Sequence, residues 1–284
     1  MLAVLGGLGA AVAWAAATLC SARASRMIGA TATLAWVMIV GLVLIAPALA
    51  ASHVPASLDA AAIGWLALAG VGNVAGLLFE YAGLRVGKVG VVAPIASTEG
   101  VIAALLSVLG GERLGVATLA TLTLVGAGVV LASMDRTAAE HTPGRRREST
   151  GAQLAVAAAI AFGCGLYATG RVGHRVPVAW AVLPPRLVGV AALAVPLALS
   201  RRLRRPGRAG PLVVAAGIAE VVGFASFTLG ARHGIAVSAV LASQFAAFAA
   251  VAAYLLLRER LSRVQLTGVT AIVVGVAALG GLRA

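Results

Sequence analysis

Long apolar runs recur along the whole sequence, and each is nearly free of charge. A helix needs about 20 apolar residues to cross the hydrocarbon core of a bilayer, so each run is long enough to span it. Lipid cannot satisfy free backbone groups, and the runs lack strict alternation, so helices are expected rather than barrel strands. The predicted spans are 2–22, 31–51, 60–83, 89–110, 115–134, 151–170, 178–200, 211–231, 235–257 and 264–282.

The composition supports an all-α integral membrane protein with about ten spans. The chain is 61% apolar and 11% charged, whereas soluble domains are about 45–50% apolar and about 25% charged. Its net charge of +13 does not indicate a nucleic-acid partner. The basic residues form short clusters between apolar runs, where Lys and Arg fix membrane orientation. We expect a multi-pass protein of the cell (inner or plasma) membrane, in contact with lipid.

The sequence also aligns with itself. "GVGNVAGLLFEYAGLRVGKVG" from Gly70 matches "GIAEVVGFASFTLGARHGIAV" from Gly217 without a gap, and Glu112-Arg113-Leu114 then fall on Glu259-Arg260-Leu261. This predicts two five-helix repeats, 1–134 and 151–284, joined by a basic linker, 135–150. Because five is odd, the second repeat enters the membrane from the opposite side. Inverted repeats of this kind are common in secondary transporters, whose two halves can rock about a central site.

With this organisation the chain resembles the drug/metabolite transporter superfamily in its EamA-like branch. The resemblance rests on the ten spans, the two repeats, the Glu-Arg pairs, Trp14, Tyr167 followed by Arg171, and Arg186. Ala15 follows Trp14 where the family often has glycine. The resemblance implies an alternating-access carrier of small metabolites such as amino acids, frequently an exporter.

Two carboxylates lie near the predicted bilayer midplane. Glu99 follows Ser97 and Thr98, and Pro94 weakens the helix one turn earlier. Glu220 aligns with Asn73 in the other repeat, so both halves place a polar side chain at one position. Ionisable residues at this depth are functional candidates by default. We expect both to line a substrate cavity and to be candidates for proton coupling; purely structural roles are the alternative.

Further residues extend this cavity. Gln244 aligns with Ser97, and aromatic residues could form walls that suit an amine. Arg186 could either snorkel to the interface or pair with a carboxylate inside, while Glu80 is expected to form an interfacial ion pair with Arg85 and Lys88. The predicted cavity comprises Trp14, Asn73, Ser97, Glu99, Tyr167, Glu220, Phe224 and Gln244.

The charges of the connections and the family resemblance predict opposite orientations of the chain in the membrane. Sixteen Lys and Arg residues lie at the odd-numbered connections, and five lie at the even-numbered ones and the C-terminus. The positive-inside rule therefore places the odd connections in the cytoplasm and both termini outside. The family resemblance implies the reverse. The Glu112-Arg113 and Glu259-Arg260 pairs are expected to cap helices and anchor the interface.

The expected function is a secondary active or facilitative transporter of an amino acid, an amine or a related compound. Export is favoured, proton coupling is left open, and the protein could be a monomer or a homodimer. No metal, cofactor or catalysis is expected, since the four histidines show no metal spacing and no phosphate-binding loop is present. The alternatives are an intramembrane enzyme acting on a lipid-linked substrate, or a channel or scaffold.

Overall fold

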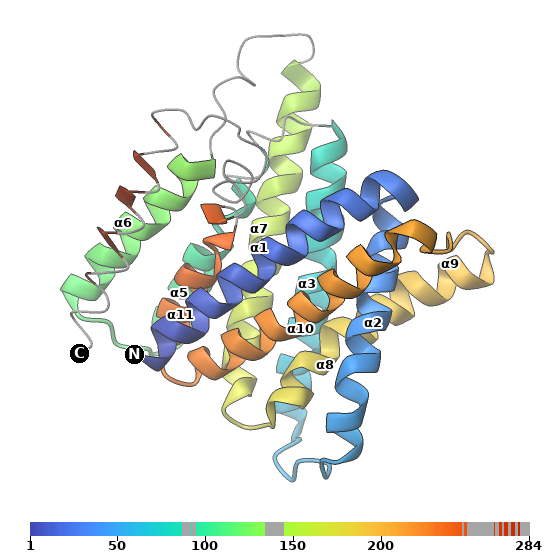
Figure 1. The fold of residues 1–284 in the computed structure, drawn as a ribbon. Helices are drawn as coiled ribbons and strands as arrows, with labels where there is room; N and C mark the ends of the chain where they lie inside the picture. The colour runs from blue at the N-terminus through green and yellow to red at the C-terminus, as the bar shows by residue number, and fades with distance from the viewer. Residues whose placement is uncertain are drawn as a thin grey trace.

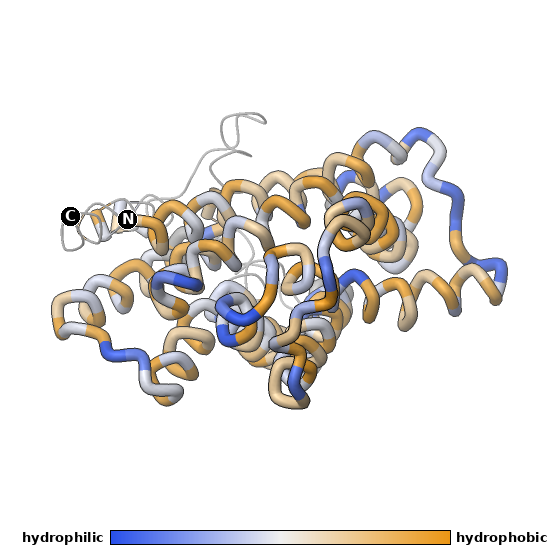
Figure 2. The backbone as a smooth tube through the Cα atoms, turned by 90° about the horizontal axis from the view of Figure 1, so that it is seen from below, coloured by the Kyte–Doolittle hydropathy of each residue, from blue (hydrophilic) through white to orange (hydrophobic). Residues whose placement is uncertain are grey.

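The computed structural model describes residues 1–86, 92, 95–133, 145–245 and 247–248, and scattered residues between 264 and 278. Every regular element in these residues is a helix (Figure 1), which confirms the all-α prediction for this part of the chain. Hydrophobic residues dominate the helices, and hydrophilic ones gather in the connections (Figure 2). The helices are α1 (Leu2–Ile28), α2 (Ala30–Ala50), α3 (Ala60–Val86), α5 (Glu99–Leu109), α6 (Val116–Ser133), α7 (Arg145–Gly173), α8 (Val178–Gly189), α9 (Val195–Leu199), α10 (Gly210–Ala231) and α11 (Ile235–Ala242).

Six segments of the described chain are long and apolar enough to cross a bilayer. They coincide with the first three and the sixth to eighth predicted spans: Leu2–Ile28, Ala30–Ala50, Ala60–Gly83, Thr150–Gly173, Val178–Leu199 and Gly207–Ala231. The shorter helices α5, α6 and α11 lie within the fourth, fifth and ninth predicted spans. Most of the tenth, 264–282, lies outside the described residues. The total of ten spans therefore stays a prediction.

Two helices extend by more than one turn beyond their predicted spans. α1 continues to Ile28, past the predicted end at 22, and α7 begins at Arg145, inside the predicted linker 135–150. Arg and Glu are good helix formers, so a helix can continue beyond its apolar segment into polar sequence. The preceding residues 134–144 lie outside the described part of the chain.

Local signals explain where several helices begin and end. Gly29 separates α1 from α2 with φ +91°, and Gly234 separates α10 from α11 with φ +151°; glycine adopts such angles without steric cost. Asp59 caps α3, because its Oδ1 accepts the Ala62 N–H at 2.7 Å. An N-terminal cap of this kind satisfies a backbone donor that the helix itself leaves free.

The seventh span runs from Val178 to Leu199 but changes its winding in the middle. α8 contains Pro184 and Pro185, and a π-helical turn, η2 (Val190–Ala194), leads into α9. Proline removes backbone donors from a helix, and π turns recur near functional sites. Arg186 lies between the prolines and this turn.

The helices pack in pairs that join the two halves of the sequence. The most extensive contacts are α1 with α10 and α3 with α7, which lie side by side in Figure 1. In the predicted repeat, α1 corresponds to α7, α2 to α8 and α3 to α10. Exchanging the halves turns the α1–α10 pair into α7–α3 and the α2–α10 pair into α8–α3. All four contacts occur, so the packing of these helices carries the symmetry expected of a duplication.

Glycines allow these pairs to approach closely. A Cβ on Gly72 of α3 would lie 2.6 Å from the Ala161 carbonyl oxygen of α7, and one on Gly6 of α1 would lie 2.4 Å from Cα of Gly230 in α10. Helices in lipid associate through such close packing of small residues. Gly76 of α3 likewise accepts the Phe162 ring.

The fourth and ninth spans are each interrupted by a turn. Ser97 and Thr98 form the first turn, directly before α5, and Ser243 and Gln244 form the second, directly after α11. The two turns are equivalent positions of the repeat. They also lie close in space, since a Cβ on Gly100 would lie 2.5 Å from Ser243 Oγ. Interrupted helices at the interface of inverted repeats are a feature of transporter binding sites.

Candidate functional site

A cavity of about 340 Å³ lies between α1, α3, α5, α7 and α10. It extends along α1 from Trp14 to Ser25 and then to Ala30 at the start of α2. The cavity therefore reaches towards the odd-numbered connections of the chain. Its lining residues are Trp14, Ala17, Thr18, Ser21, Ser25, Ala30, Asn73, Leu77, Glu80, Tyr81, Glu99, Phe162, Gly165, Leu166, Glu220, Phe224 and Phe245.

Five of the eight residues predicted from the sequence lie on this wall: Trp14, Asn73, Glu99, Glu220 and Phe224. The repeat explains two of them. Asn73 and Glu220 are equivalent positions, and so are Leu77 and Phe224, one turn further along α3 and α10. Because α3 and α10 exchange under the symmetry of the fold, equivalent positions face the same central space.

Tyr167 is not among the residues that line this cavity. Phe162, Gly165 and Leu166 form the cavity face of α7 at helical spacing, and Tyr167 follows one residue later, about 100° around the helix. Its ring packs edge-on against Trp65, with ring centroids 5.6 Å apart. Tyr167 lines a second cavity instead, together with Glu112, Arg171 and His174. Its predicted contact with substrate stays a prediction.

Ser97 and Gln244 lie at the two helix interruptions but are not among the cavity-lining residues. Both are buried, and neither amide atom of the Gln244 side chain has a hydrogen-bond partner among the described residues. Glu99, two residues after Ser97, occupies the first position of α5.

Glu80, which was predicted to form an interfacial ion pair, lies on the cavity wall. The sequence could have predicted this position, because Asn73, Leu77 and Glu80 are spaced i, i+4 and i+7 and therefore share one face of α3. The nearby basic residues Arg85 and Lys88 favoured the interfacial interpretation. The Arg85 side chain, Lys88 and Pro94 all fall outside what the structure describes.

Arg186 is buried inside the bundle, which decides between its two predicted positions. It is 1% exposed, and its Nη2 lies 3.6 Å from Glu220 Oε2. Its guanidinium carbon stands 4.6 Å from the centre of the Phe224 ring. Arg186 thus forms a cation–π contact and supplies a positive charge beside Glu220.

Two glycines shape the surroundings of these side chains. A Cβ on Gly41 of α2 would lie 3.1 Å from Arg186 Cγ, so this glycine leaves room for the arginine. A Cβ on Gly223 of α10 would lie 2.5 Å from Trp14 Nε1. The absence of a side chain at Gly223 therefore allows the Trp14 indole to seat against α10, where it meets Phe224 edge-on with centroids 5.2 Å apart.

Polar atoms without partners concentrate around the cavity. Trp14 Nε1, Asn73 Oδ1, Arg186 Nη1 and Glu220 Oε2 are buried and have no hydrogen-bond partner among the described residues. Buried polar groups in folded proteins are nearly always hydrogen-bonded. Several such groups around one cavity are therefore candidates for contacts with a bound molecule.

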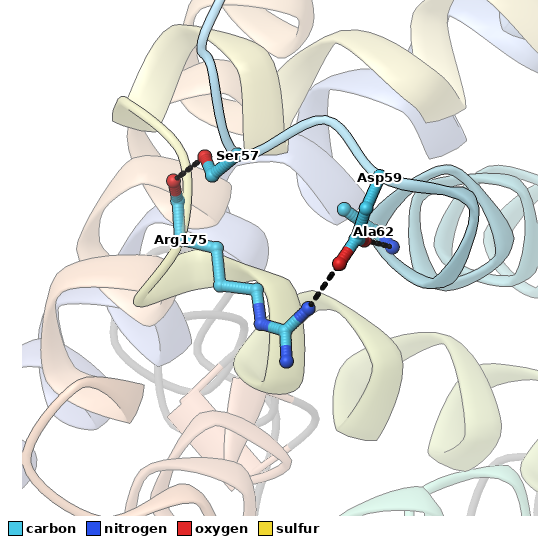
Figure 3. A network of polar contacts seen from close by, with 4 residues as sticks. All are labelled: Ser57, Asp59, Ala62 and Arg175. Carbon is cyan, nitrogen blue, oxygen red and sulfur yellow. Dashed lines mark hydrogen bonds and ion pairs between the residues drawn. The ribbon is translucent and has the colours of Figure 1, made fainter.

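Polar contacts join the even-numbered connections on the other side of the molecule. Figure 3 shows Asp59, before α3, paired with Arg175, after α7, at 3.3 Å, while Ser57 donates to the Arg175 carbonyl. Arg232, at the end of α10, donates to the carbonyls of Gly173 at 2.6 Å and Val176 at 2.9 Å. These contacts bind the connections to one another on the side away from Ser25 and Ala30.

Glu112 connects the same side to α11. Its carboxylate accepts the Ala236 N–H at 3.2 Å and the Ser107 hydroxyl. The prediction that the Glu112-Arg113 pair caps a helix is confirmed for Glu112, and the helix belongs to the other half of the chain. The equivalent Glu259 and Arg260 lie outside the described residues.

Comparison with known proteins agrees with this architecture. Residues 1–134 and 149–281 match the EamA-like transporter family. The chain is also similar to a solved structure titled "Crystal structure of protein", with 21% identity over 99% of this chain and 96% of that chain, and a TM-score of 0.79. At that identity the similarity concerns the fold. No curated protein matches. Since the family match covers both halves, the chain belongs to the EamA-like transporter family, as its sequence predicted.

Proposed function

We propose that the protein is a secondary active or facilitative carrier that moves a small metabolite across the membrane by alternating access. The observation that supports this most strongly is the cavity between symmetry-related helices. It reaches towards one side of the molecule, while polar contacts join the connections on the other side. A carrier needs a central site that is accessible from one side at a time.

The finer features of this proposal rest on fewer observations. Export follows from the family resemblance. Proton coupling, through Glu99 or Glu220, follows from carboxylates inside the predicted spans, since chains of such groups serve as proton relays in transporters. We place the carrier in the cell (inner or plasma) membrane, as a monomer or homodimer.

Flux into proteoliposomes tests this proposal. A panel of amino acids, amines and nucleobases would be measured with and without a pH gradient. A carrier predicts saturable flux of at least one compound, and Glu99→Gln should reduce it at least tenfold because Glu99 lies on the cavity wall. Acceleration by the pH gradient would support proton coupling.

Glu148→Gln provides the matched control. Glu148 lies near the start of α7, 14 residues before the cavity-lining Phe162, which is about 21 Å along the helix axis. Flux that never saturates would contradict a carrier and favour a channel. If flux saturates but Glu99→Gln does not reduce it, the proposed role of Glu99 is wrong, and the proposed carrier function is unaffected.

A further inference from the structure

The charges around the cavity do not balance within the described residues. Glu80 of α3, Glu99 of α5 and Glu220 of α10 all line it, and their carboxylates lie close enough to interact electrostatically. The described lining contains no Lys, Arg or His. Arg186, outside that lining, pairs with Glu220. The carboxylates of Glu80 and Glu99 are therefore left without a described cationic partner.

Glu99 is the most deeply buried of these three glutamates. It is 5% exposed, yet it lies on the cavity wall and takes part in neither of the described ion pairs. A buried carboxylate carries a large cost unless it is paired or neutralised. The unpartnered Asn73 Oδ1 adds a hydrogen-bond acceptor to the same wall.

Aromatic rings form much of the remaining surface. Trp14, Tyr81, Phe162, Phe224 and Phe245 line the cavity. Aromatic faces attract cations, most strongly where water is excluded, and they also accommodate apolar groups. A volume of about 340 Å³ lies at the small end of the range of ligand pockets, about 300–1,000 Å³. The surface thus suits a small molecule with a positive group and an apolar body.

The same charges discriminate against a carboxylate on the ligand. An amino acid would bring one, but the described lining offers no cation to receive it. Arg186 is already held between Glu220 and Phe224. An unpaired charge of this kind would cost binding free energy.

We infer that the cavity binds a small organic amine in its cationic form, with the charged group against Glu80 and Glu99 and the apolar body against the aromatic wall. This inference rests on the proposed carrier function and names the class of its substrate. A neutral alcohol of the same shape lacks the charge, and the corresponding amino acid adds an unfavourable one.

Binding to the purified full chain in detergent at neutral pH tests the inference. The probes are phenethylamine and hexylamine, compared with 2-phenylethanol, 1-hexanol, phenylalanine and 3-phenylpropanoate. At least one amine should bind at least tenfold more tightly than its neutral counterpart, and more tightly than the two carboxylates. Glu80→Gln and Glu99→Gln should each weaken amine binding at least tenfold, and Glu148→Gln should leave it within twofold.

Selectivity of the wild-type protein is the deciding measurement, because it requires no variant to fold. Absence of amine binding, or equal affinity for an amine and its alcohol, would overturn the inference. Tighter binding of phenylalanine or 3-phenylpropanoate would do the same.

Flux of the probes into proteoliposomes separates the two proposals. Selective amine binding without flux would contradict the carrier function but not the amine site. Saturable flux of a neutral or anionic compound without amine binding would contradict the amine site but not the carrier function.

Discussion

At the scale of single residues, Arg186–Glu220 is the more buried of the two described ion pairs. Arg186 is almost fully buried, Glu220 is 18% exposed, and the pair joins α8 to α10. Removing one partner of a buried ion pair leaves the other charge uncompensated, which costs about 3–5 kcal/mol. Removing both leaves no such charge.

A double-substitution cycle tests this dependence. Arg186→Met should lower the midpoint of thermal unfolding in detergent, because Glu220 then stays buried without its cation. Arg186→Met combined with Glu220→Gln should recover at least half of that loss. A double variant no more stable than Arg186→Met would show that the arginine acts through its packing against Gly41 and Phe224 rather than through its charge.

The sequence could predict cavity residues where the repeat and the helical period agree. Asn73 and Glu220 were found by aligning the two halves. The place of Glu80 on the cavity wall was not predicted, because its basic sequence neighbours suggested an interfacial partner. The face of α7 that carries Tyr167 could not be predicted, because it depends on how the helices pack. Arg186 had two plausible environments, and only its contact with Glu220 decides between them.

At the scale of helices, two glycines hold aromatic rings from the neighbouring helix. Gly76 of α3 accepts Phe162, and the equivalent Gly223 of α10 accepts Trp14. Both rings also line the cavity. These glycines therefore determine helix spacing and the position of the cavity wall together.

Adding one methyl group at either glycine should be destabilising. Gly76→Ala and Gly223→Ala would each place a Cβ within 2.5 Å of a ring atom, and overpacking of this kind costs about 1–3 kcal/mol. Both should lower the thermal midpoint and weaken substrate binding. Gly64→Ala, on α3 with nothing within 4 Å, is the control and should be neutral. If Gly64→Ala lowers the thermal midpoint by the same amount, the effect comes from replacing a helical glycine with alanine and not from contact with a ring.

The helices were predictable to different degrees. Long apolar runs define α2, α3 and α10 within a few residues, because the bilayer sets their length, whereas α1 and α7 continue further into polar sequence. The interruptions at Ser97-Thr98 and Ser243-Gln244 were not located, although Pro94 had suggested a weakened helix nearby. Their positions coincide with the crossing of α5 and α11 at Gly100, a tertiary contact that local sequence does not contain.

At the scale of the whole molecule, the cavity reaches the side that carries most of the basic connections. If these connections face the cytoplasm, as the positive-inside rule predicts, the structure is open inwards. If the termini are cytoplasmic, as the family resemblance implies, it is open outwards. On the opposite side, Arg232 fastens α10 to the end of α7 through two backbone carbonyls.

Removing Arg232 should favour opening on that opposite side. In a variant with Cys20 and Cys164 replaced by Ser, Ile235→Cys places a thiol on the second cavity, at a residue that is 8% exposed. Adding Arg232→Ala should raise its rate of labelling by a maleimide at least fivefold. Arg208→Ala, at an exposed residue before α10, should leave the rate unchanged. An unchanged rate with Arg232→Ala would mean that these hydrogen bonds do not hold the side closed.

The pairing of α1 with α10 and of α3 with α7 has a consequence for motion. Because backbones touch in both pairs, neither pair can separate without losing its tightest packing. The bodies that move against each other should then each keep one of these pairs, α1 with α10 in one body and α3 with α7 in the other. Each body takes helices from both repeats. The boundary between the moving bodies therefore differs from the boundary between the two repeats.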